Sequence, residues 1–134
     1  MMLLDSNIII YAAKPENIFL RQFIAENAPL VSAISYVEAL GYHKLTPDEK
    51  QNLEMFFSTA STIMISQAIL DRAVKLRQSR KMSLGDSFVA GTALAHDLTL
   101  VTRNTEDFKW ISDLKLLNPF ERSESTPHEE KSQN

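Results

Sequence analysis

The sequence predicts an α/β fold in which a parallel sheet is covered by helices on both faces. Short apolar runs that favour strands alternate along the chain with patterns typical of helices. Strands separated in this way by helices are expected to pair in parallel and to be buried on both faces. The length of 134 residues is that of one domain, which can bury a core without disulfides or a structural metal.

Five apolar runs are predicted as strands. Four are short and apolar, and a fifth is a weaker candidate for an edge strand. In chain order the predicted strands are Met2–Asp5, Leu30–Ala33, Thr62–Ser66, Leu98–Thr102 and, as the weak edge strand, Lys115–Leu117. The predicted sheet therefore has four to five strands.

Helical patterns fill the stretches between the strands. The predicted helices are Pro15–Asn27, Ser35–Leu45, Pro47–Thr59, Gln67–Lys81 and Leu84–Asp97, with a short helical turn at Glu106–Trp110. Pro47 suits the first position of its helix, where a missing N–H costs nothing. The small apolar residues of Leu84–Asp97 predict burial in the middle of the fold.

Apolar spacing assigns inward faces to three of these helices. The inward residues are predicted to be Ile18, Phe19, Phe23 and Ile24 in the first, Leu53, Phe56 and Phe57 in the third, and Ile69, Leu70, Ala73, Val74 and Leu76 in the fourth. The outward face of the fourth helix carries five cations, namely Arg72, Lys75, Arg77, Arg80 and Lys81.

The C-terminal stretch 121–134 differs in composition from the rest of the chain. It is polar, without a large apolar side chain, and we expect a disordered tail that follows a single domain over residues 1–120. The net charge is −3, which is unusual for a nucleic-acid-binding protein. Four acids and two bases of the tail account for −2 of it, so the domain itself is nearly neutral.

Several function classes are excluded by composition. The absence of cysteine excludes disulfide scaffolds, thiolate metal sites and cysteine nucleophiles. Three glycines cannot form a dinucleotide-binding or P-loop motif, and no two histidines have the HExxH spacing. We find neither a signal peptide nor an apolar run long enough to cross a membrane, so we expect a cytoplasmic protein.

Acidic residues occupy positions where strands end and helices begin. Asp5 ends the first strand, Glu38 and Asp86 each come three residues after a serine, and Asp107 comes three residues after Asn104. Taken singly, each fits the local role of a helix cap or a capping-box acid as well as a functional role. The triplet Gly85-Asp86-Ser87 is similar to the start of one lipase family, but the histidine base that such a serine needs is missing.

Taken together, the acids predict a metal site. In a parallel sheet the ends of the strands and the starts of the following helices share one edge, where ligands bind. Carboxylates brought together there repel one another unless a cation intervenes, and oxygen ligands suit Mg²⁺ or Mn²⁺. Such a site is well suited to hydrolysing phosphodiester bonds.

The same residues resemble the motifs of PIN-domain nucleases. The matching strings are Asp5-Ser6-Asn7, Glu38 in Ser35-Tyr36-Val37-Glu38, Asp86 with Phe88-Val89-Ala90-Gly91-Thr92-Ala93-Leu94, Leu100-Val101-Thr102-Arg103-Asn104-Thr105-Glu106-Asp107-Phe108, and Asn118-Pro119-Phe120. Their order and spacing cover about nine-tenths of the chain, and small VapC-type toxins of bacterial toxin–antitoxin pairs are the most similar group.

The resemblance implies a three-layer α/β/α PIN-like fold and an endoribonuclease that uses Mg²⁺ or Mn²⁺. It also implies a homodimer and an antitoxin that blocks the site. Asp5, Glu38 and Asp86 match the metal-binding acids, and Ser6 matches a hydroxyl near the site. At the fourth position the family often has Asp where this chain has Asn104, so either Asn104 or the nearby Asp107 is expected to complete the site.

Basic and aromatic side chains supply candidates for RNA contacts. Arg80 and Lys81 lead into Asp86 and are as consistent with a solvated surface as with phosphate binding. Arg103 lies beside the fourth acid position and is the better candidate for contacting the scissile phosphate, because its guanidinium matches the geometry of phosphate oxygens. Four aromatic residues are available to stack on bases or to pack in the core, namely Tyr11, Tyr36, Tyr42 and Trp110.

Two other functions remain as alternatives. The first is an inactive PIN scaffold that binds RNA or a protein without cutting, against which the retained acids argue. The second is a receiver-like domain phosphorylated on Asp, which would need that residue at the end of the third strand. The chain reads Ile65-Ser66-Gln67 there, so this alternative is disfavoured.

Overall fold

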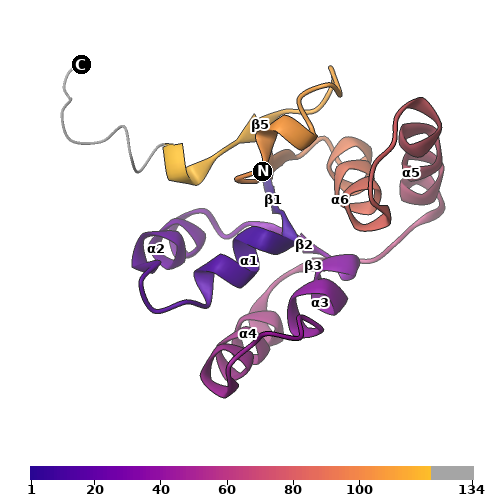
Figure 1. Ribbon diagram of the computed structural model, residues 1–134. Helices are drawn as coiled ribbons and strands as arrows, with labels where there is room; N and C mark the ends of the chain where they lie inside the picture. Colours follow the sequence, from indigo (N-terminus) through magenta and orange to yellow (C-terminus); the bar gives the residue numbers. More distant parts are fainter. Residues whose placement is uncertain (122–134) are drawn as a thin grey trace, which may run out of the picture.

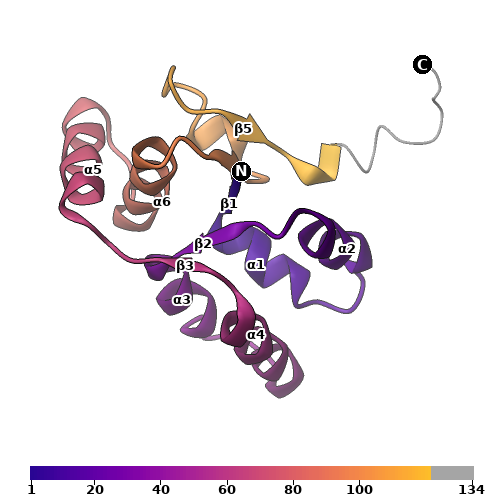
Figure 2. The same cartoon turned by 180° about the vertical axis from the view of Figure 1, so that it is seen from behind.

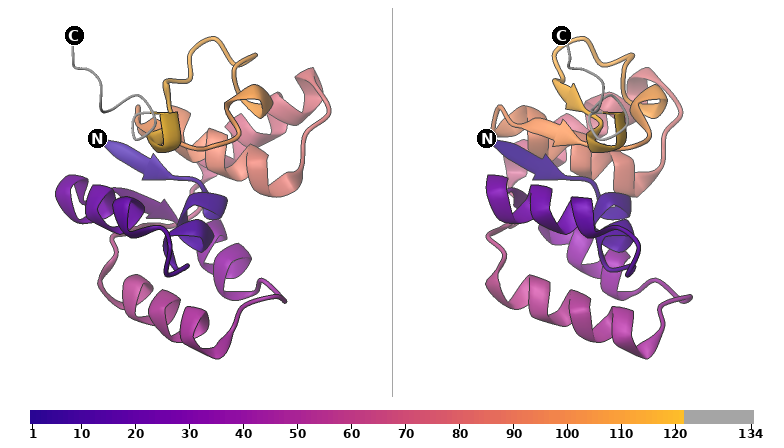
Figure 3. Two further views of the ribbon diagram at one scale, coloured as in Figure 1. Left: turned by 60° about the vertical axis from the view of Figure 1, so that its left-hand side comes forward. Right: turned by 90° about the vertical axis from the view of Figure 1, so that its left-hand side faces the viewer.

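A computed structural model of the chain describes residues 1–121 and contains a five-stranded parallel sheet with the strand order β3-β2-β1-β4-β5. The strands are β1 (Met2–Leu4), β2 (Leu30–Ser32), β3 (Thr62–Ile63), β4 (Thr99–Val101) and β5 (Leu116–Leu117). Figure 3 shows β1, in indigo, beside the orange β4, with both arrows pointing the same way. The predicted parallel α/β sheet is confirmed.

The central strand β1 explains why the apolar runs do not alternate with polar residues. Leu3 pairs with Leu30 and Leu100, and Leu4 pairs with Val31 and Val101, so both edges of β1 are hydrogen-bonded. Leu3 and Leu4 are both fully buried, although they point to opposite faces. A strand covered on both faces needs apolar side chains at every position.

Six α-helices cover the sheet in the described part of the chain. They are α1 (Ser6–Ala12), α2 (Ile18–Asn27), α3 (Ala33–Leu40), α4 (Pro47–Thr59), α5 (Gln67–Ser79) and α6 (Leu84–Ala95), and a 3₁₀ helix, η1, spans Thr105–Asp107. Figures 1 and 2 show α1 and α2 on one side of the sheet and α5 and α6 on the other. Helix α3 packs against both α1 and α6. The arrangement is the predicted three-layer α/β/α fold.

Two apolar cores lie on the two faces of the sheet. Leu4, Val31 and Val101 point into the core beneath α1, α2 and α4. Leu3 and Leu100 point into the core beneath α6, which also holds Phe108. Burying such side chains is worth about 1.5–3 kcal/mol each, so the two cores supply the main stabilisation of the fold.

Helix α1 was not among the helices predicted from apolar spacing. Its three consecutive isoleucines, Ile8–Ile10, favour a strand because their β-branched side chains are restricted in a helix. In the structure Ile8 and Ile9 are buried against the core, and this tertiary packing outweighs the local preference.

Several helix boundaries differ from the prediction. Helix α3 ends at Leu40 rather than Leu45, α6 ends at Ala95 rather than Asp97, and the short helical turn spans Thr105–Asp107 rather than Glu106–Trp110. Helix α2 begins at Ile18 rather than Pro15, and α5 ends at Ser79, which leaves Arg80 and Lys81 in an extended link. Helix α3 begins at Ala33 because the hydroxyl of Ser32 accepts a hydrogen bond from the Ile34 N–H at 3.2 Å. The cap is therefore Ser32 and not Ser35, which lies inside the helix.

Three side chains that were predicted to face inward are exposed. They are Ile18, Leu70 and Val74, with 57%, 38% and 54% of their surface accessible. In α2 Leu20 is buried and Phe19, Phe23 and Ile24 pack against the core, whereas Ile18 is the first residue of the helix. In α5 only Ile69, Ala73 and Leu76 are buried, since α6 covers one side of this outermost helix.

The predicted tail lies almost wholly outside the described residues, which end at Glu121. Over residues 1–121 no helix is both long and apolar enough to cross a membrane.

Candidate active site

Asp5 is held between the carboxyl ends of β1 and β4. Its backbone N–H donates to the Val101 carbonyl at 2.9 Å, and its Oδ2 accepts a hydrogen bond from the Thr102 hydroxyl at 2.8 Å. Only 4% of the residue is exposed. Although Asp5 occupies the N-cap position of α1, its side chain makes no capping hydrogen bond. Its carboxylate is thus directed by β4 and does not act as a cap.

Glu38 reaches the same edge of the sheet from α3. Its Oε1 accepts a hydrogen bond from the Ser6 hydroxyl at 2.7 Å, and Ser6 Oγ also lies 2.8 Å from Ser35 Oγ. Because the cap of α3 is Ser32, Glu38 is not a capping-box acid. The hydrogen bond from Ser6 instead ties its carboxylate to the residue after Asp5.

Asp86 combines a capping role with a place at this edge. The Ser83 hydroxyl accepts a hydrogen bond from the Asp86 N–H at 3.1 Å, which caps α6. The carboxylate of Asp86 also has a hydrogen bond to the Ser83 side chain. Ser83 is therefore the N-cap of α6, and it fixes the start of the helix that carries Asp86 to the site.

Four carboxylates are close enough to affect one another. Burial raises the pKa of Asp5 to about 6, and the negative charges of Asp86 and Glu38 add to this, while hydrogen bonds from Thr102 and the Ser6 N–H oppose it. Burial likewise raises the pKa of Asp86, helped by the charges of Asp107 and Glu38. The structure thus brings Asp5, Glu38, Asp86 and Asp107 together in one negative cluster, which we call the acidic cluster.

Gly85 makes room for the acidic cluster. A Cβ at this position would overlap Oε2 of Glu38, so the carboxylate of Glu38 lies directly against the Gly85 backbone. Any other residue at position 85 would push the Glu38 side chain away from its bond to Ser6.

Both candidates for the fourth position of the site, Asn104 and Asp107, have a connection to the acidic residues. The Asn104 N–H donates to the Thr102 hydroxyl at 3.0 Å, which places Asn104 beside the residue that holds Asp5. Its side chain does not cap η1. Asp107 is the one that acts electrostatically on Asp86.

Sequence reasoning missed Thr102 and Ser35 as members of the site. Both are fully buried polar residues. Thr102 ends the apolar run of β4 and connects Asp5 to Asn104, whereas Ser35 lies beside Ser6. A hydroxyl at the end of a buried strand was the available signal for Thr102, but nothing local distinguishes Ser35 from a capping serine.

The basic candidates lie in two separate places. Arg103 places its guanidinium 4.1 Å from the ring centre of Phe120 and 5.6 Å from that of Tyr11. Arg80 lies 5.4 Å from the ring centre of Trp110. Arg80 and Lys81 also line a pocket of about 530 Å³ that reaches Asp86 and Asp107, and Arg103 does not.

The donor set of the acidic cluster suits a hard divalent cation. All its ligand atoms are oxygens, and no ion pair within residues 1–121 involves Asp5, Glu38 or Asp86. Burial and the neighbouring negative charges both raise the pKa values of Asp5 and Asp86, and a bound cation would offset both effects. In the described part of the chain no three acidic or histidine side chains already form a metal-ligand set, so binding would draw the carboxylates closer.

Comparison with known protein families and structures agrees with this geometry. The PIN domain family matches residues 2–114, which is most of the chain. The chain belongs to the PIN-domain family. At the level of the family it is a nuclease. A search of curated protein sequences found no match.

Solved structures with the same fold come from toxin–antitoxin complexes. The chain is 33% identical to a chain of a toxin–antitoxin complex from Klebsiella pneumoniae, with a TM-score of 0.68 over 89% of this chain and 98% of that one. It is 25% identical to a chain of VapBC2 from Rickettsia felis bound to a promoter DNA fragment, with a TM-score of 0.74 over 87% and 97%. For DNA-bound VapBC from Salmonella typhimurium the identity is 20% and the TM-score 0.75 over 88% and 97%. The predicted similarity to VapC-type proteins is confirmed.

Proposed function

We propose that the chain is an Mg²⁺- or Mn²⁺-dependent endoribonuclease and the toxin of a toxin–antitoxin pair. The observation that carries this proposal is the acidic cluster, in which a buried Asp5 and three further carboxylates lie together and, within residues 1–121, form no ion pair with a cationic side chain. Such an arrangement lowers the stability of the metal-free fold, and it is explained most simply by a cation that the working protein binds.

Each residue of the site has a proposed role. Asp5, Glu38 and Asp86 hold the metal, and either Asn104 or Asp107 completes the site. Thr102 orients Asp5, and Ser6 orients Glu38, through the hydrogen bonds already described. Bound Mg²⁺ would lower the pKa of a water and neutralise charge on the phosphate oxygens.

The proposed reaction is hydrolysis of an RNA phosphodiester bond. Water adds to phosphorus in line with the bond from phosphorus to the 3′ oxygen, and that bond breaks. The products are a 5′-phosphate and a 3′-hydroxyl. The role proposed for Arg103, Arg80 and Lys81 is to hold the phosphates of the RNA near the carboxylates.

RNA cleavage with and without metal tests the proposal. Purified chain, freed from any antitoxin, is incubated with mixed cellular RNA in Mg²⁺, in Mn²⁺ or in EDTA, and the products are sized. We expect cleavage with either metal, none in EDTA, and a loss of at least about 100-fold for Asp86→Asn, because the charge that attracts the metal is reduced.

Asp113→Asn is the matched control, since this exposed aspartate lies outside the acidic cluster. Its activity should equal that of the wild type. Cleavage that persists in EDTA or in Asp86→Asn would contradict the mechanism. RNA binding without cleavage under every condition would favour the inactive scaffold instead.

The protein partner in this proposal is an antitoxin made in the same cytoplasm. The toxin–antitoxin complex from Klebsiella pneumoniae contains a chain of the same fold, which supports a partner of this kind. A narrow apolar pocket of about 210 Å³ between α1, α2 and α4 offers a binding site. Its lining includes Ile9, Ala13, Ile24, Leu53 and Phe56, so it would accept apolar side chains of the antitoxin.

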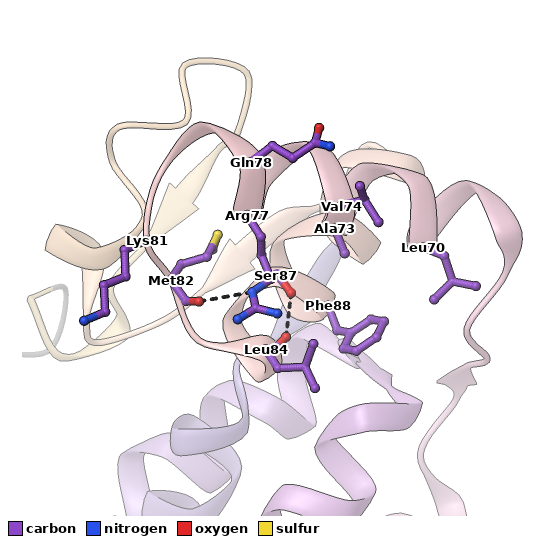
Figure 4. Close-up of a pocket in the computed structure, with 10 residues that line it drawn as sticks. All are labelled: Leu70, Ala73, Val74, Arg77, Gln78, Lys81, Met82, Leu84, Ser87 and Phe88. Atoms are coloured by element: carbon purple, nitrogen blue, oxygen red, sulfur yellow. Dashed lines mark hydrogen bonds between the residues drawn. The ribbon is translucent and has the colours of Figure 1, made fainter.

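A second copy of the chain is proposed to cover α5 and α6. Figure 4 shows Leu70, Val74, Leu84 and Phe88 around a pocket of about 560 Å³ between these helices. Three of these apolar side chains are exposed, namely Leu70, Val74 and Leu84. Exposed apolar side chains that lie together usually mark an interface, and a homodimer would bury them. Light scattering of the purified chain measures this directly, and a monomer at micromolar concentration would contradict it.

A further inference from the structure

The pocket lined by Trp110 brings together cations, carboxylates and an aromatic ring. It has a volume of about 530 Å³, within the range of roughly 300–1,000 Å³ that small-molecule sites occupy. Its lining includes the cations Arg77, Arg80 and Lys81 and three carboxylates, namely Glu106 and the Asp86 and Asp107 of the acidic cluster. Trp110 also lines the pocket, so a flat aromatic surface lies next to both groups of charges.

The ring of Trp110 is held in one orientation. Its Nε1–H donates to the Asp107 carbonyl at 3.0 Å. Part of the ring packs against the apolar core beneath α6, and the residue is half-buried. A stacking surface fixed in this way loses little conformational entropy when a ligand binds.

The exposed face of the ring already accommodates a planar cation. The guanidinium of Arg80 lies 5.4 Å from the ring centre, although no carboxylate within residues 1–121 forms an ion pair with it. Aromatic rings and arginine are the two kinds of side chain on which unpaired bases stack. Arg80 is at the end of α5 in extended backbone, from which its long side chain can turn toward a phosphate.

We propose that this pocket binds one unpaired nucleotide of an RNA strand, with its base stacked on Trp110 and its phosphate held by Arg80 and Lys81. The inference rests on the proposed ribonuclease function and adds a binding site to it. Because Asp86 and Asp107 line the same pocket, a nucleotide held there would be adjacent to the phosphodiester bond presented to the acidic cluster.

Trp110 is the only tryptophan in the chain, so its fluorescence reports on this pocket alone. The full chain is titrated in EDTA, where no cleavage occurs, with an oligouridylate of about eight nucleotides. Stacking of a base on the ring should quench the emission. Duplex RNA and inorganic tripolyphosphate serve as ligands that carry phosphate without an unpaired base, and neither should quench it.

Variants separate stacking from charge. Trp110→Leu should weaken binding of a labelled oligouridylate by about 5- to 150-fold, the range for loss of one stacked base, whereas Trp110→Phe should retain most of the affinity. Arg80→Ala should also weaken binding. Lys115→Ala is the matched control, because this exposed cation pairs with Asp97 and neither of these two residues lines the pocket.

The outcomes distinguish this site from the proposed function. Quenching by oligouridylate alone, with the ranking of variants above, supports the site even if the chain cuts no RNA. Equal responses to tripolyphosphate, or to a polyglutamate of similar charge, would overturn it, as would an affinity that is the same for Trp110→Leu and Trp110→Phe. If the chain cleaves RNA but its Trp110 fluorescence does not change when RNA is added, the proposed nucleotide pocket is wrong and the proposed ribonuclease function stands.

Discussion

Asp5→Asn is expected to abolish RNA cleavage and at the same time to stabilise the metal-free fold. The loss of activity should be at least about 100-fold, because the amide is neutral and a poor ligand for Mg²⁺. The gain in stability follows from burial. The wild-type carboxylate is charged at neutral pH with only 4% of the residue exposed, and this burial raises its pKa from an ordinary 3.8 to about 6.

The size of the gain follows from the two pKa values. A difference of about two units corresponds to roughly 3 kcal/mol of unfolding free energy above pH 7. The amide can still accept the hydrogen bond from Thr102, but its buried NH₂ group needs a partner, so we expect a net gain of about 1–3 kcal/mol. Urea unfolding in EDTA at pH 7.5 measures it. A variant less stable than the wild type would contradict the argument.

The pH dependence of the unfolding free energy tests the same argument, because its direction follows from the raised pKa of Asp5. The pKa of Asp5 is higher in the folded than in the unfolded chain, so its stabilising effect is complete below about pH 4 and is lost as the pH rises through about 6. Asp86 acts in the same direction, whereas Glu49, whose pKa is lowered by hydrogen bonds from Thr46 and by Lys14, acts in the opposite one. The informative quantity is therefore the difference in unfolding free energy between wild type and Asp5→Asn, which should grow between pH 4 and 7.

Added Mg²⁺ should make the wild type more stable than Asp5→Asn, which reverses the difference in unfolding free energy expected in EDTA. Mg²⁺ that binds only the folded wild type raises its unfolding free energy with concentration, and Asp5→Asn should gain little. Asp113→Asn, in the exposed turn after η1, is the control for the chemical change itself and should alter neither stability nor its pH dependence by more than about 0.5 kcal/mol.

Gly85→Ala is expected to lower RNA cleavage at least about tenfold without loss of stability. The new methyl group would occupy the position of Oε2 of Glu38, which must turn away from Ser6. The atom displaced is the end of a flexible side chain, and alanine is favoured over glycine in a helix by about 1 kcal/mol. Cleavage rate and urea unfolding, measured on the same preparation, test the two halves of this prediction.

Gly91→Ala is the matched control, because it makes the same change in the same helix. There a Cβ would lie 3.1 Å from the Ile69 carbonyl oxygen and 3.3 Å from the Ala73 nitrogen, both backbone atoms of α5. We expect this variant to lose stability because α5 and α6 must separate slightly. If Gly85→Ala destabilised the fold as much as Gly91→Ala, the loss of cleavage would reflect unfolding and not the position of Glu38.

The order of strands and helices could be predicted from the sequence because it depends on local composition. Continuous apolar runs such as Met2–Leu4 require burial on both faces, and only a parallel sheet between helices provides it. The positions of Asp5, Glu38 and Asp86 at one edge of that sheet follow from the same topology. Helix α1 could not be predicted in this way, because Ile8 and Ile9 favour a strand until the core packs against them.

The roles of the acids were decided by the tertiary structure. Ser83 and Asp86 do cap a helix, while the similar pair Ser35 and Glu38 does not, because the chain enters α3 three residues earlier, at Ser32. The same local pattern thus has two outcomes. Only contacts between distant segments, such as Thr102 with Asp5 and Ser6 with Glu38, distinguish a carboxylate that ends a helix from one that belongs to a shared negative cluster. Sequence determined which residues lie at the edge of the sheet, and long-range packing decided which of their side chains meet.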